Sequence, residues 1–168
     1  MRRLYILFLL SSIFIVVSCN DNKNSPTDTN SEYLSEFQIT TTKAGHKEWS
    51  LVAEKALQKG QDTLIILFNF KLTFFENDSF KSNLVADSGL FFPNKGNLYA
   101  FENVHVLTKD SVKLLTDSLF WDNEDKKLHA PGKIELIRSN FILLGSDLQS
   151  NNDLDEIVIK HVEGKKKL

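Results

Sequence analysis

The sequence predicts an all-β domain whose antiparallel strands fold over to enclose an apolar interior. Three observations support this fold class: stretches of alternating apolar and polar residues, short polar turns between them, and a motif that recurs about every 30 residues. Repeats with periods of roughly 20 to 50 residues are typical of stacked structural units that share a core. After Gly60, no stretch has the length and periodicity of a crossover helix, so we do not expect a parallel sheet.

The recurring motif has two aliphatic residues, a small residue, and then an acidic or hydroxyl residue. Its four copies begin at Leu51, Leu84, Leu114 and Leu143. Because residues i and i+2 of a strand lie on the same face, the first aliphatic residue shares a face with the small residue. We expect these pairs to line a narrow interior. The second aliphatic residue of each copy lies on the opposite face, which favours a roll or a folded-over sheet over a flat sheet.

Each repeat unit is predicted to be a hairpin onto which the next unit pairs. Residues 64–75 alternate as a long strand, with Phe70 and Phe74 on the face that is apolar throughout. Residues 49–59 fit both helical and strand periodicity, and their alignment with the other copies favours a strand. Polar segments predict turns at residues 76–79, 93–97, 108–110, 123–127, 130–132 and 150–153.

The N-terminus predicts export and a lipid anchor. Arg2 and Arg3 precede an apolar segment that is short for a membrane span, and the segment ends in Val16-Val17-Ser18-Cys19. This ending resembles the lipobox of bacterial lipoproteins, in which the cysteine is lipidated. We therefore expect a signal peptide at residues 1–18 and a flexible tether at residues 19–32, beginning with lipidated Cys19. The domain would occupy residues 33–164, followed by a basic tail at residues 165–168.

Composition and spacing exclude several function classes. The chain has a net charge of −2, and loss of Arg2 and Arg3 with the signal peptide leaves −4, so we expect no nucleic-acid partner. The four histidines are too dispersed for a metal site, and no nucleophile elbow or phosphate-binding loop is present. Asp117 recurs as Glu54 and Asp87, which indicates a turn or edge role rather than catalysis. We predict no enzyme, no metal and no cofactor.

The motifs, taken in order, resemble the LptC family, a component of the bacterial lipopolysaccharide export machinery. Gly45 and the segment from Trp49 to Ala53 look like the opening of the family's first motif. Leu114-Leu115-Thr116-Asp117-Ser118-Leu119-Phe120-Trp121-Asp122 looks like its central stretch, and Gly145 looks like its second recurrent glycine. Two features depart from the family. Many relatives have a glycine where this chain has Glu102, and the better-known relatives have a membrane helix in place of a lipobox.

The resemblance implies an open, twisted antiparallel β-jellyroll of stacked hairpin repeats. It implies a carrier that receives lipopolysaccharide from the membrane subunits of an inner-membrane ABC transporter and passes it to a periplasmic bridge protein of the LptA type. The chain would then be a lipoprotein variant, lipid-anchored at the periplasmic face of the inner membrane. Its groove for the acyl chains of lipid A would be lined by Leu51, Phe70, Phe74, Leu84, Leu114 and Leu143.

Other readings remain open at this point. The chain could be a structural or adaptor lipoprotein with a solid core. It could also be the periplasmic bridge protein itself, but the expected lipid anchor argues against that. The last strand, residues 154–162, is the candidate docking edge for the next jellyroll, through Leu154, Ile157, Val158 and Ile159. An ordinary closing strand is the alternative.

Overall fold

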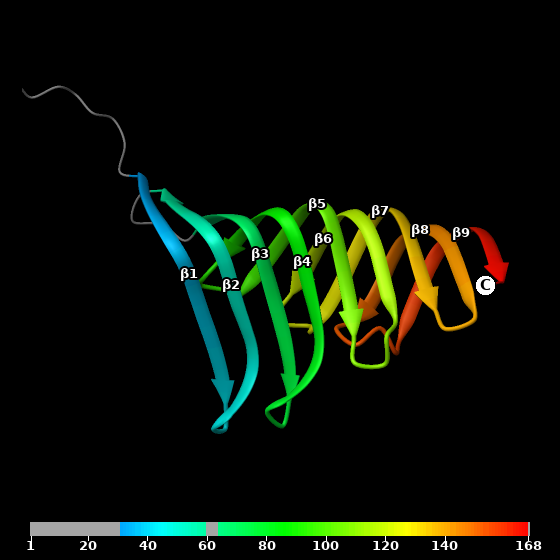
Figure 1. Ribbon diagram of the computed structural model, residues 1–168, viewed down its shortest axis with the longest axis horizontal. Helices are drawn as coiled ribbons and strands as arrows, with labels where there is room; N and C mark the ends of the chain where they lie inside the picture. The colour runs from blue at the N-terminus through cyan, green and yellow to red at the C-terminus, as the bar shows by residue number, and fades with distance from the viewer. Residues whose placement is uncertain (1–30, 60–63, 168) are drawn as a thin grey trace, which may run out of the picture.

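The computed structural model describes residues 31–59 and 64–167, in which nine strands form one antiparallel sheet. The strands follow one another in the sheet in sequence order, so each pairs only with its neighbours in the chain (Figure 1). They are β1 (Ser31–Lys43), β2 (His46–Lys59), β3 (Ile65–Glu76), β4 (Ser79–Phe92), β5 (Asn97–Thr108), β6 (Lys113–Asp122), β7 (Lys127–Arg138), β8 (Phe141–Asn151) and β9 (Ile157–Lys167).

The predicted all-β antiparallel class is confirmed, and residues 49–59 belong to a strand, β2. The predicted signal peptide, Cys19 and the tether up to residue 30 lie outside the described residues. Both predicted domain limits are wrong by a few residues. Strand β1 already begins at Ser31, and β9 continues to Lys167, so the expected basic tail pairs with the start of β8.

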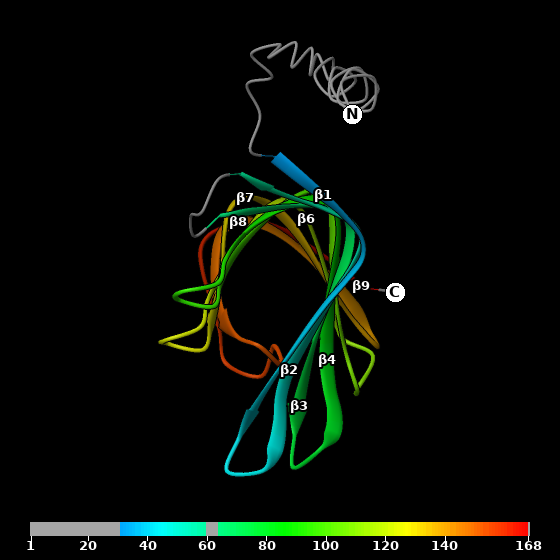
Figure 2. The same cartoon turned by 90° about the vertical axis from the view of Figure 1, so that its left-hand side faces the viewer.

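The sheet bends over in the middle of its strands and forms a roll (Figure 2). At the bend, regular pairing is interrupted along one line that crosses the sheet. The unpaired residues on this line, here named the bend row, are Glu36, Glu54, Asn69, Asp87, Glu102, Asn103, Asp117, Pro131, Gly132, Asp147 and Lys160. Irregular pairing of this kind bends strands and increases their twist. A single sheet thereby covers its own apolar face.

Left-handed backbone conformations produce the bend. In the bend row, Glu36, Asn69, Asn103 and Asp147 have φ values of 55°, 48°, 49° and 58°. Asn and Asp reach this region at lower cost than other residues with a Cβ. Glu102, beside Asn103, has a φ of 64° and lies inside β5 at the bend.

The recurring acidic residues have a structural explanation at the bend. The Asn69 amide donates a hydrogen bond to Glu54 across 2.7 Å, and the Asn103 amide donates one to Asp87 across 2.6 Å. These side chains are exposed on the outside of the roll. The prediction of a turn or edge role is therefore wrong, because Glu54, Asp87 and Asp117 all lie within strands in the middle of the sheet. Of these three acids, Glu54 and Asp87 accept a hydrogen bond from the neighbouring strand.

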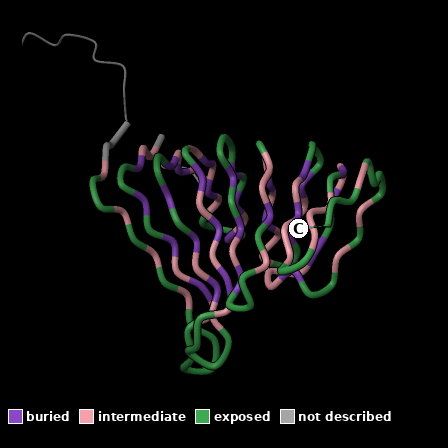
Figure 3. Tube along the Cα trace, turned by 45° about the vertical axis from the view of Figure 1, so that its right-hand side comes forward, coloured by how far each residue is buried: buried purple, intermediate pink, exposed green. Residues whose placement is uncertain are grey.

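The interior is built from rows of inward side chains. Leu51, Leu72, Leu84, Val106, Leu114, Leu136 and Leu143 occupy successive paired positions from β2 to β8. Buried positions alternate with more exposed ones along most strands, while most of the turn residues are exposed or partly exposed (Figure 3). The period of about 30 residues in the sequence thus corresponds to two consecutive strands and the turns that join them.

Most predicted turns are confirmed, and one is wrong. Residues 77–78, 93–96, 109–110, 123–126 and 152–153 lie in connections between strands. Pro131 and Gly132 lie inside β7, at the bend, where proline and glycine relieve an interrupted ladder. The β7–β8 turn falls instead at residues 139–140.

Replacing Glu102 with glycine tests whether the left-handed backbone is strained. Glu102→Gly should raise the free energy of unfolding by up to about 1 kcal/mol, because glycine adopts this φ without a Cβ clash. As a control, Glu135→Gly in β7, where φ is not positive, should lower it by about 1 kcal/mol. Urea unfolding midpoints measure both changes. Equal losses at the two positions would show that Glu102 carries no strain.

Candidate binding groove

The six predicted groove residues all face the interior of the roll. Leu51, Phe70, Phe74, Leu84 and Leu114 are buried in one cluster, and Leu143 is partly buried and packs against it. They come from β2, β3, β4, β6 and β8. Their side chains form much of the wall contributed by one layer of the roll. That they contact a ligand stays a prediction.

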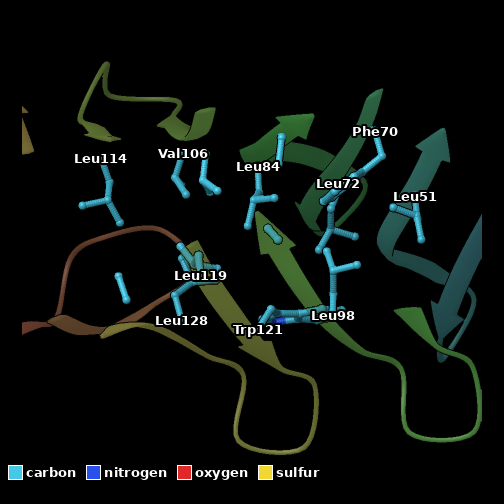
Figure 4. Packing of buried hydrophobic residues seen from close by; sticks show 14 of the residues in the cluster. Leu51, Phe70, Leu72, Leu84, Leu98, Val106, Leu114, Leu119, Trp121 and Leu128 are labelled. Atoms are coloured by element: carbon cyan, nitrogen blue, oxygen red, sulfur yellow. The ribbon is translucent and has the colours of Figure 1, made fainter. Parts of the chain in front are cut away.

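Sequence reasoning missed the wall that faces these residues. Leu98, Leu119, Trp121 and Leu128 come from β5, β6 and β7 and are at most 2% exposed. Figure 4 shows them in a row opposite Leu51, Leu84, Val106 and Leu114. The signal was present in the alternation of Leu119 with Trp121, which follows the third copy of the motif. The motif itself covers only the first half of each long strand, so it points to one wall.

Four aromatic rings join the two walls at the mouth, the side of the roll opposite the bend. Trp49 lies edge-on to Trp121 with ring centroids 5.4 Å apart and edge-on to Phe91 at 5.9 Å. Phe74 meets Trp121 at 5.0 Å. Each such pair contributes about 0.5–1.5 kcal/mol beyond burial. The cluster packs β2 and β3 against β4 and β6. Strand β6 is not a neighbour of β2 or β3 in the sheet, so these contacts cross the roll.

The two indoles of this cluster leave polar groups unpaired. Trp49 Nε1 and Trp121 Nε1 are buried and have no hydrogen-bond partner among the described residues. A buried donor without an acceptor costs about 1–3 kcal/mol. Two such donors in one apolar cluster are suited to an oxygen acceptor that enters with a ligand, such as an ester or amide carbonyl.

The β8–β9 loop, residues 152–156, crosses the mouth and is here named the mouth strap. Leu154 is fully buried in the core cluster. Its assignment to an exposed docking edge is therefore wrong: β9 begins only at Ile157, and Leu154 precedes it in the loop. Asn151 closes the loop at its base, because its side-chain oxygen accepts hydrogen bonds from the backbone N–H groups of Asp155 and Glu156.

Polar contacts hold the mouth strap against strands β4 and β7. Lys81 Nζ lies 2.8 Å from Asp153 Oδ2, and Arg138 donates a hydrogen bond of 2.8 Å to the Leu154 carbonyl. The Ser82 hydroxyl donates to the Asn152 carbonyl. Burial lowers the pKa of Lys81, but the hydrogen bond and charge of Asp153, together with Glu76, outweigh it and hold this pKa above its ordinary value.

The outer face carries shallow depressions of its own. One, of about 450 Å³, is lined by Val85, Leu107, Leu115 and Ile137 among others. A second, of about 410 Å³, shares His105 and Leu115 with the first. Both lie outside the roll, on the face that carries the second aliphatic residue of each motif. An outer ligand surface is thus a geometric alternative to the interior.

Strands β1 and β9 have unpaired edges in the described sheet. On β9, Val158 is 62% exposed, whereas Ile157 and Ile159 are partly buried and pack against the core. The predicted edge residues other than Leu154 therefore lie on the last strand, on both of its faces. Backbone groups along such an edge can pair with a strand of another chain.

The two family-like glycines have different structural roles. Gly45 has a φ of 86° and follows Ala44, with a φ of 52°, in the two-residue connection between β1 and β2. Two consecutive positive φ values are those of a type I′ hairpin turn. Gly145 lies at the bend in β8, where an added Cβ would lie 2.5 Å from the His161 carbonyl oxygen of β9. Only a residue without a side chain fits that approach.

The described residues contain no group of three potential metal ligands among His, Cys, Asp and Glu. Likewise, none of their elements is a helix long and apolar enough to cross a membrane. The candidate site is the apolar interior with its mouth and its two free edges, and the outer depressions are the geometric alternative.

The chain is an open antiparallel roll with a continuous apolar interior and two free strand edges among its described residues. The chain belongs to the family described as "Lipopolysaccharide-assembly, LptC-related", which it matches over residues 4–165. No curated protein matches it in a sequence comparison. The family is one of transport proteins rather than enzymes, acts in lipopolysaccharide transport, and is associated with the periplasmic side of the inner membrane.

Substituting the glycine at the bend tests the close approach of β8 and β9. Gly145→Ala should lower the free energy of unfolding by about 1–3 kcal/mol, because the new methyl group overpacks against the β9 backbone. Gly164→Ala, in β9, is the matched control, since nothing lies within 4 Å of the added Cβ. Thermal unfolding measures both changes. If the two variants unfold at the same temperature, the strand separation at Gly145 is wider than described.

Proposed function

We propose that this chain is a lipid-carrier subunit of lipopolysaccharide export, which shelters acyl chains of lipid A in the interior of its roll. The observation that carries the proposal is the unbroken inward row from Leu51 to Leu143, which crosses seven strands and meets no charged side chain. Transfer of each methylene from water to such a row is favourable by about 0.8 kcal/mol. A carrier of this kind needs no catalytic residue.

The proposal assigns one partner to each of the two free edges. One edge would receive lipid from the membrane subunits of the ABC transporter, and the β9 edge would pass it to a bridge protein of the LptA type. Strand addition at an edge extends the apolar row into the neighbouring roll without exposing acyl chains to water. Val158 and the backbone of β9 would form the second junction.

The anchor completes the proposal. Lipidated Cys19 would hold the chain at the periplasmic face of the inner membrane. The polar segment after it would link the anchor to the domain. Such an anchor replaces the membrane helix of better-known relatives, because either one keeps the roll close to the transporter.

A second candidate function has its own supporting observation. The inward residues Leu51, Leu84, Val106 and Leu114 are all 0% exposed, so the interior is filled by its own side chains. A filled roll suits a structural or adaptor lipoprotein that transfers no lipid. Depletion separates the two functions: loss of a carrier reduces lipopolysaccharide at the cell surface, whereas loss of such an adaptor leaves it unchanged.

Photo-crosslinking tests the groove directly. A crosslinking residue at Leu84 or Leu114 should capture lipopolysaccharide in cells, because both side chains face the interior. Lys113, adjacent to Leu114 and exposed, is the matched control and should capture little. Immunoblots for lipopolysaccharide adducts measure the yield. Capture only from Lys113 would place the lipid on the outer face and refute the groove.

Proline substitution tests the proposed bridge junction. Val158→Pro should abolish co-purification of the bridge protein, because proline disturbs the outer edge of β9 and cannot donate a backbone hydrogen bond. Val158→Thr keeps the N–H group and a β-branched side chain, so it should bind normally. Both variants should retain the transporter's membrane subunits in a pull-down from membranes. Unchanged capture of the bridge protein by Val158→Pro would assign the junction elsewhere.

A further inference from the structure

The mouth strap closes the C-terminal half of the roll with an apolar residue and polar fastenings. Leu154 enters the core from a loop, whereas every other buried hydrophobic residue of the core cluster comes from a strand. The fastenings are the Lys81–Asp153 ion pair, the Arg138–Leu154 hydrogen bond and the Ser82–Asn152 hydrogen bond. No ladder of backbone hydrogen bonds joins the strap to β4 or β7 in the described sheet.

Two features of the closed strap are unfavourable. Leu154 has a φ of 57°, a left-handed conformation that is costly for leucine. Asp153 Oδ1 is buried and has no hydrogen-bond partner among the described residues, although Oδ2 of the same carboxylate binds Lys81. Strain and an orphaned buried acceptor are typical of segments that are held by their surroundings and move in function. Opening would relieve both.

In its closed position the strap also contacts two cationic side chains at the mouth. Lys81 and Arg138 approach the strap from β4 and β7, and each gives it a charge-assisted contact of 2.8 Å. The side chains of Lys81 and Asp153 are only 18% and 15% exposed, so solvent screens their attraction less than on an open surface. When the strap leaves, both cations become available to another anion directly above the apolar interior.

We propose that the mouth strap is a built-in stand-in for an anionic acylated lipid. In the loaded state an acyl chain takes the place of the Leu154 side chain. A phosphate or carboxylate of the headgroup takes the place of Asp153 at Lys81 and of the Leu154 carbonyl at Arg138. The inference rests on the proposed carrier function and deepens it, because it names the residues that contact the two ends of the ligand. Because an apolar group replaces an apolar group and an anion replaces an anion, the interior is filled in both the closed and the loaded state.

The exchange also explains how a filled interior can accept lipid. For a ligand that binds only the open state, the apparent Kd equals the intrinsic Kd divided by the fraction of molecules that are open. Weakening the closed state should therefore tighten lipid binding, provided that the cations remain. If the strap were instead part of a preformed site, weakening its contacts would weaken lipid binding.

Binding of a deep-rough lipopolysaccharide to the full chain tests the proposal. Asp153→Ala removes the ion pair between the strap and Lys81 but keeps the cations of Lys81 and Arg138. This variant should lower the apparent Kd for lipopolysaccharide by about tenfold. Asp155→Ala removes the same charge from an exposed position of the same loop and should leave the Kd unchanged. Arg138→Gln should raise the Kd. An unchanged or raised Kd for Asp153→Ala would overturn the inference.

A second measurement needs no substitution. In the wild-type chain, the same lipopolysaccharide should increase cleavage before Asp153 and Asp155 by an Asp-specific protease several-fold. Cleavage before Asp125, in the exposed β6–β7 turn, should not change and serves as the internal control. Unchanged or slower cleavage in the strap would contradict displacement. If Leu84 and Leu114 still crosslink to lipopolysaccharide in that case, the carrier function stands and only the strap inference fails; if they do not, both fail.

Discussion

The whole structure depends on one constraint: a single sheet with one apolar face must bend every strand at the same level to cover that face. Antiparallel pairing transmits the bend from strand to strand, because a change of direction in one strand must be matched in the next. Asn69 and Asn103 supply the left-handed backbone and bond the acids of the adjacent strands at Glu54 and Asp87. The interior, the mouth and the two free edges all follow from this line.

The sequence predicted the parts of the fold that repeat. The recurrence of Leu51, Leu84, Leu114 and Leu143 identified one inward row, because a period of about 30 residues returns to the same position after two strands. The strand in residues 49–59 could be chosen over a helix only through this recurrence. Local pattern and repeat agreed there, and both agree with the structure.

The features that sequence reasoning misplaced are those set by long-range geometry. Pro131 and Gly132 look like a turn in the sequence, yet they lie inside β7, because the bend needs the same backbone freedom as a turn. Asp117 was assigned a turn or edge role because it recurs as Glu54 and Asp87, yet all three acids lie at the bend within strands. Leu154 was assigned to the last strand by its alternation with Glu156 and Val158. Only the contact of Arg138 with the Leu154 carbonyl and that of Lys81 with the adjacent Asp153 place this loop across the mouth.

The central claim is that acyl chains lie inside the roll, and the direct test is nuclear magnetic resonance of the methyl groups in a complex with lipid A. Nuclear Overhauser contacts from acyl methylenes should reach the inward methyl groups of Leu51, Leu84 and Leu114. Contacts confined to the outward methyl groups of Val52 and Leu144, which are 43% and 42% exposed, would contradict the claim.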